Sequence, residues 1–114
     1  MSNETLRLTE GWTTPIEYKL LHEDPETGEL TVPEGLADMT PSLVLKDKDG
    51  NAIDTSSDVE WADAANGIVR YNPDATALTA AKSPFTAKFK VTDASSKIAY
   101  FPQGEPLIWR VYAP

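Results

Sequence analysis

The sequence predicts an all-β fold, an immunoglobulin-like antiparallel β-sandwich of about seven to nine short strands that forms one domain over residues 1–114. Apolar and polar residues alternate with a period of two in several segments, which is the pattern of strands with one buried face. Nine prolines and six glycines separate these segments at short intervals, as turns do in antiparallel sheets. A chain of 114 residues can also bury a core of its own without disulfides.

Three segments show the alternation most clearly. Their inward-facing residues are Ile16, Tyr18 and Leu20 in the first, Phe85, Ala87, Phe89 and Val91 in the second, and Leu107, Trp109 and Val111 in the third. Shorter apolar runs predict further strands at residues 43–46, 52–54, 59–61, 68–71 and 98–101.

Turn signals separate the predicted strands. Residues 48–51 (Lys-Asp-Gly-Asn) predict a hairpin with glycine in the left-handed region, and residues 65–67 (Ala-Asn-Gly) predict a second hairpin. Residues 102–106 begin and end with proline, which cannot donate to a ladder and therefore interrupts the last strand pair. Residues 73–84 are rich in alanine, and we expect one helical turn directly after the proline at their start.

Composition argues against several classes of partner and site. The absence of cysteine rules out disulfides, thiolate nucleophiles and cysteine zinc sites. The net charge of -8, from 18 acidic and 10 basic residues, argues against nucleic acid and anionic membranes as partners. The N-terminal residues do not resemble a signal peptide, and no apolar run approaches the roughly 20 residues of a membrane span. We therefore expect a protein made and kept in a cytoplasm, with no membrane partner.

The sequence offers little material for catalysis or metal binding. The single histidine, His22, is expected to be solvated at a strand end, with no cysteine beside it and no serine in a nucleophile motif. The four residues with the spacing of calcium ligands are Asp47, Asp49, Asn51 and Asp58. Glycine is missing from the sixth position of that loop and glutamate from the twelfth, so a plain hairpin is expected instead. We predict that the protein is not an enzyme and has no cofactor, metal or catalytic residue.

The tryptophans allow two interpretations. Trp61 and Trp109 alternate with polar or outward-facing residues, so both are expected in the core between two sheets. Trp12 lies in a turn-like context before a proline and is expected to be only partly buried. An alternative function, a carbohydrate-binding β-sandwich module, would require such rings to lie coplanar on an open surface.

Three segments follow one another in an order that resembles a known family. They are residues 35–54 (GLADMTPSLVLKDKDGNAID), residues 65–93 (ANGIVRYNPDATALTAAKSPFTAKFKVTD) and residues 95–111 (SSKIAYFPQGEPLIWRV). From about Leu8 to Val111, the chain resembles the N-terminal domain of phage baseplate upper proteins, an immunoglobulin-like domain of phage and prophage tails. The resemblance implies a closing hairpin with proline in its turn, no catalytic residues, and a place in the virion as a tail, baseplate or neck component.

The resemblance implies partners among other phage structural proteins, or copies of the same chain in a ring. The residues expected to contact such partners are Phe101, Ile108, Tyr112, Glu23, Asp24 and Glu26. The first three are candidates for the strand face opposite the core, where a partner would cover them, while either Tyr100 or Phe101 is expected to add to the core. The last three belong to an acidic loop that would steer a basic partner, or that alternatively only keeps the protein in solution. Segments 6–9 and 30–32 are expected to be edge strands with unpaired backbone groups.

Overall fold

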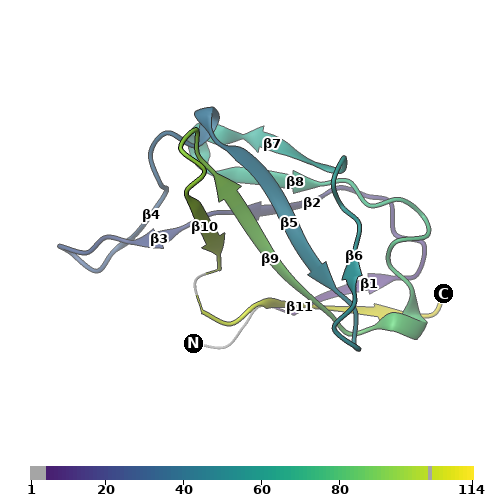
Figure 1. Ribbon diagram of the computed structural model, residues 1–114. Coiled ribbons are helices and arrows are strands. Elements are labelled where there is room, and N and C mark those ends of the chain that lie inside the picture. Colours follow the sequence, from purple (N-terminus) through teal and green to yellow (C-terminus); the bar gives the residue numbers. More distant parts are fainter. Residues whose placement is uncertain (1–4, 103) are drawn as a thin grey trace.

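Strands form almost all of the regular structure of the protein (Figure 1). The structure, a computed structural model, describes residues 5–102 and 104–114. The strands within these ranges are β1 (Thr5–Thr9), β2 (Ile16–Lys19), β3 (His22–Glu23), β4 (Leu30–Thr31), β5 (Thr40–Lys46), β6 (Ala52–Ile53), β7 (Val59–Asp63), β8 (Ile68–Tyr71), β9 (Phe85–Thr92), β10 (Ile98–Phe101) and β11 (Leu107–Tyr112). Short 3₁₀ turns are η1 (Leu36–Asp38), η2 (Ala64–Asn66) and η3 (Ala80–Lys82).

Two sheets form the layers of a sandwich. The larger has six strands in the order β1-β11-β9-β5-β6, with β10 also paired to β9, and the smaller has the order β2-β8-β7. In Figure 1 the smaller sheet lies behind the larger one, while the β3–β4 hairpin projects away from both. The predicted all-β sandwich is therefore confirmed. One ladder differs from the antiparallel expectation, because β1 pairs with β11 in parallel.

Strand β9 is the centre of the larger sheet. One of its edges pairs with β5 over seven residues, and its other edge is shared by β10 and β11. Phe101 of β10 lies opposite Phe89, and Leu107 of β11 lies opposite Ala87. Phe101 and Leu107 therefore lie opposite residues of β9 that are separated only by Lys88. The expectation of a hairpin at the end of the chain is wrong, because in the described ranges β10 and β11 each pair with β9 and not with each other.

Four aromatic rings form the middle of the core and join the two layers. Tyr18 of the smaller sheet stacks on Phe89 of the larger one, with ring centroids 5.4 Å apart and planes 10° from parallel. Tyr71 of the smaller sheet stacks in the same way on Trp109 of the larger one, at 5.9 Å and 17°. Phe89 and Trp109 contact each other at 6.5 Å, so the rings are continuous across the sandwich. The alternation predicted for β9 and β11 is confirmed by their burial.

Two turns illustrate how local sequence shapes the connections. Gly67 ends the turn between β7 and β8 and has φ +73°, in the left-handed region. A Cβ there would lie 2.8 Å from Cγ1 of Val32, so glycine is required. The helical turn expected directly after Pro73 forms later, as η3. Asp74 explains the difference, because its carboxylate accepts a hydrogen bond from the backbone N–H of Thr76 at 2.8 Å. Such a local turn competes with helix formation.

Trp109→Ala is expected to destabilise the protein by about 3–5 kcal/mol, since it removes a ring that is 98 % buried between the layers. Urea unfolding followed by circular dichroism measures the loss. Tyr112→Ala on the same strand is the matched control, because that ring is 48 % exposed and its removal should change stability by less than about 0.5 kcal/mol. Equal losses in the two variants would contradict the proposed core.

Candidate interaction surfaces

The outer face of the six-stranded sheet carries a concentration of positive charge. Its members are Arg7 of β1, Lys46 of β5, Lys88 and Lys90 of β9, and Arg110 of β11, which we call the basic face. Strand alternation puts them there, because the residues on either side of Lys88 and Lys90 are buried in the core. The residues of β5 and β10 that pair with Lys88 and Lys90 in the strand registers therefore also face outward.

No acidic residue occupies an outward strand position of this sheet in the described ranges, although the chain has 18 acids and only 10 bases. The acids nearest to these strands in the sequence, among them Glu10, Asp47 and Asp93, lie just beyond the strand ends. Arg7 and Arg110 are direct neighbours in the β1–β11 register. Like charges directly opposite each other destabilise a sheet, so the isolated fold does not account for this pair.

Exposed apolar side chains lie among these cations. Ile98 is 51 % exposed, Tyr100 45 % and Tyr112 48 %, and all three point outward from the same sheet. The ammonium of Lys88 lies 5.9 Å from the centre of the Tyr100 ring, within range of a cation–π contact. The basic face therefore combines charge with aromatic and aliphatic surface, which is a composition suited to binding another molecule.

The sequence-predicted contact residues of β10 and β11 divide between this face and the core. Tyr112 is exposed and Ile108 is half-buried, both on the outward side of β11. The expectation that Phe101 lies on the exposed face is wrong, because it is only 3 % exposed and lies opposite the inward-facing Phe89. Tyr100, opposite Lys90, takes the outward position instead. These positions follow from the register between β9 and β10, which the alternation of β10 alone does not determine.

The β3–β4 hairpin carries the other predicted contact residues. Its acids are Glu23, Asp24, Glu26 and Glu29, and we call residues 22–31 the acidic hairpin. The carboxylate of Asp24 accepts a hydrogen bond from the backbone N–H of Glu26 at 2.8 Å, and thereby holds the turn. Glu26 and Glu29 are exposed, as is Leu30 at 58 %. His22 lies at the base of the hairpin, half-exposed and paired with Thr31 in the ladder.

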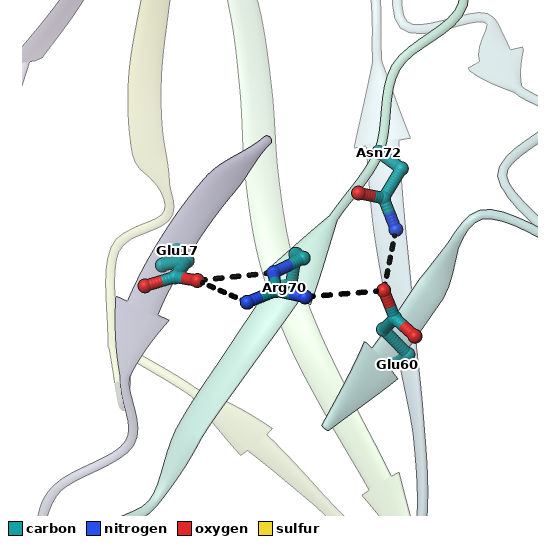
Figure 2. Close-up of polar contacts among 4 residues, drawn as sticks. All are labelled: Glu17, Glu60, Arg70 and Asn72. Atoms are coloured by element: carbon teal, nitrogen blue, oxygen red, sulfur yellow. Dashed lines mark hydrogen bonds and ion pairs between the residues drawn. The ribbon is translucent and has the colours of Figure 1, made fainter. Parts of the chain in front are cut away.

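The outer face of the smaller sheet has a different electrostatic arrangement, which Figure 2 shows. Arg70 of β8 donates to Glu17 of β2 at 2.8 Å and lies 3.5 Å from the carboxylate of Glu60 on β7. Asn72 donates its side-chain amide to Glu60 at 2.9 Å. The hydrogen bond with Glu17 raises the pKa of Arg70 above its ordinary value. This arginine is therefore satisfied within the fold and joins three strands.

An apolar groove of about 500 Å³ opens between β1 and β2, the edge strands of the two sheets. Trp12, Tyr18 and Trp109 are among its lining residues. Trp12 is half-buried as expected, and its buried indole N–H has no hydrogen-bond partner among the described residues. Trp61 packs against the core but is only partly buried, whereas full burial was expected, and its indole N–H donates to the carbonyl of Met39 at 3.0 Å.

Asp47 is one of the candidate calcium ligands, and its carboxylate closes the β5–β6 hairpin. It accepts hydrogen bonds from the backbone N–H groups of Asp49 at 2.9 Å and Asn51 at 3.0 Å. Burial pushes the pKa of Asp47 upward, but the hydrogen bonds with Asn51 and Asp49 and the charge of Lys82 outweigh this and lower it. Across residues 5–102 and 104–114, no cluster of three or more His, Cys, Asp or Glu side chains could hold a metal ion.

Comparison with known proteins finds no family model that matches this sequence and no curated protein with significant similarity to it. Within the part of the chain that the structure describes, no helix has the length and apolar character needed to cross a membrane. The candidate surfaces are thus defined by the geometry of this chain itself: the basic face, the acidic hairpin and the groove.

Asp47→Asn is expected to reduce stability at pH 7, with a difference from wild type that shrinks in acid. A carboxylate whose folded pKa is lowered stabilises the protein above its unfolded pKa of about 3.9, and this contribution disappears as pH falls through the folded value. Urea unfolding at several pH values between 7 and 2.5 measures the difference. Asp49→Asn, an exposed neighbour in the same turn, serves as the control. A difference that stays constant down to the lowest pH would refute this role for Asp47.

Proposed function

We propose that this protein is a structural component of a phage or prophage tail, in the tail itself, the baseplate or the neck, and that it acts by docking to other proteins. The observation that carries the proposal is the basic face, with exposed Ile98, Tyr100 and Tyr112 among five cations. Arginine and tyrosine are enriched at protein interfaces, while charges on the rim of an interface mainly guide association.

The environment of the titratable side chains also favours docking over catalysis. His22 and the nearby carboxylates lie on a projecting hairpin, and Asp47 is engaged with backbone N–H groups. The groove between β1 and β2 is lined mainly by apolar side chains, with Glu17 as its one ionisable carboxylate, and that group is paired with Arg70. A general acid or base needs a titratable group within reach of a bound substrate.

The virion role rests on the resemblance of the sequence to the N-terminal domain of phage baseplate upper proteins. In this proposal the chain is synthesised in the bacterial cytoplasm and incorporated into the virion. A rigid two-layered sandwich suits that role, because the core holds the strands in place while the outward residues contact neighbours.

The proposed location is tested by inducing phage particles from a bacterium that encodes this chain and purifying the tailed particles. Quantitative mass spectrometry should find the chain in a fixed molar ratio to the other tail proteins, and labelled antibody should mark the tail in electron micrographs. The host ribosomal proteins are the control for contamination. Recovery of the chain only in the particle-free fraction would reject the proposal.

A carbohydrate-binding module is the second candidate, and the groove favours it specifically. Trp12 and Tyr18 line this groove, and their rings would offer a sugar the aromatic surface on which its apolar face stacks. If this candidate is correct, bacterial surface oligosaccharides should shift the tryptophan fluorescence, and Trp12→Ala should weaken binding by at least about tenfold. Trp61→Phe, outside the groove, should bind as wild type. An unchanged spectrum across the oligosaccharides would eliminate this candidate.

A further inference from the structure

We infer that the basic face of one copy binds the acidic hairpin of a second copy, so that the chains associate head to tail. This inference rests on the proposed docking function and names the partner. It is carried by two oppositely charged surfaces, which lie on separate parts of one molecule.

The two surfaces are complementary in charge. The basic face holds five of the ten basic residues of the chain, and the acidic hairpin holds four acids within residues 22–31. In the described part of the chain, the recorded ion pairs involve Arg70 and not these five cations. The neighbouring Arg7 and Arg110 would gain most from an acidic partner, because it would relieve their mutual repulsion.

The two surfaces also match in shape and in apolar character. The acidic hairpin projects from the sandwich (Figure 1), so it can reach a flat sheet on another molecule. Leu30, 58 % exposed, lies on this hairpin beside the acid Glu29. The basic face offers Ile98 and Tyr112 as apolar surface for it. Exposed ion pairs alone contribute little, so burial of these side chains would supply the remainder of the affinity.

Symmetry gives the form of the assembly. The two surfaces are different, so a copy that binds one neighbour through its hairpin still has its basic face free for the next. Such a head-to-tail contact produces a closed ring when the rotation between copies closes, and an open filament when it does not. A ring of identical subunits is the arrangement that a tail or baseplate component would need.

Single-stranded nucleic acid is the competing occupant of this face. A sheet with cations and tyrosines such as Tyr100 and Tyr112 is also a surface on which bases stack. The net charge of -8 and the acidic hairpin on the same molecule oppose a polyanion. We therefore favour the second copy, and an oligonucleotide serves as the competing ligand in the test.

The experiment is a charge swap on the full chain, measured by light scattering and sedimentation. The face variant is Lys88→Glu with Lys90→Glu, and the hairpin variant is Glu26→Lys with Glu29→Lys. Asp24 is left unchanged because it holds the turn. Matched controls change the same charges elsewhere: Lys19→Glu with Lys48→Glu, and Glu34→Lys with Asp38→Lys, all at exposed positions.

Wild type should self-associate at low salt and dissociate as salt rises, because the contact is electrostatic. Each of the two variants should associate at least about tenfold more weakly than wild type, and the controls should not. An equimolar mixture of the two variants should recover association, as should one chain that carries all four substitutions. Circular dichroism checks that every variant is folded.

A wild type that stays monomeric at about 1 mM protein would overturn the inference, and so would a mixture that fails to recover. The inference would also be overturned if wild type does not self-associate but binds oligothymidine of about 20 nucleotides in a salt-sensitive complex, and the face variant abolishes that complex. A monomer that still copurifies with phage tails would reject this inference and leave the proposed function intact. Self-association without copurification with phage tails would support this inference and reject the proposed function.

Discussion

The stacking of aromatic rings between the two sheets is the interaction on which the other features of the fold depend. Tyr18 on Phe89 and Tyr71 on Trp109 each join one layer to the other. Rings of this size fill the gap of about 10 Å between packed sheets, and each such pair contributes about 0.5–1.5 kcal/mol beyond its buried area. Because these rings fix which side of β9 and β11 faces inward, they also determine which residues, such as Lys88, face outward.

The two outer faces of the sandwich differ in how their charges are balanced. On the smaller sheet Arg70 lies between Glu17 and Glu60, so its charge is neutralised by the fold itself. On the larger sheet Arg7 and Arg110 are neighbours with no acid at an outward strand position among the described residues. The first arrangement stabilises the isolated domain, whereas the second becomes favourable only when another molecule contributes negative charge.

The sequence alone predicted the sandwich and most of its strands, because burial on one face leaves a period of two in β9 and β11. It did not predict that β10 and β11 follow one another along β9, or that β1 pairs in parallel, because strand pairing depends on contacts between distant residues. The position of Phe101 depended on that pairing. The basic face was missed for the same reason: Arg7 and Lys88 are 81 positions apart in the sequence and share a surface only through the sheet order.

The parallel ladder between β1 and β11 also determines how the domain would resist mechanical force. A pull applied at Thr5 and Tyr112 in opposite directions slides the two strands past each other along their length. The five register pairs from Thr5↔Ile108 to Thr9↔Tyr112 would then have to fail together, since none can be peeled away first. Resistance to forced unfolding is set by the rate of such a rupture, so a load applied at these two ends would be carried as shear along β1 and β11.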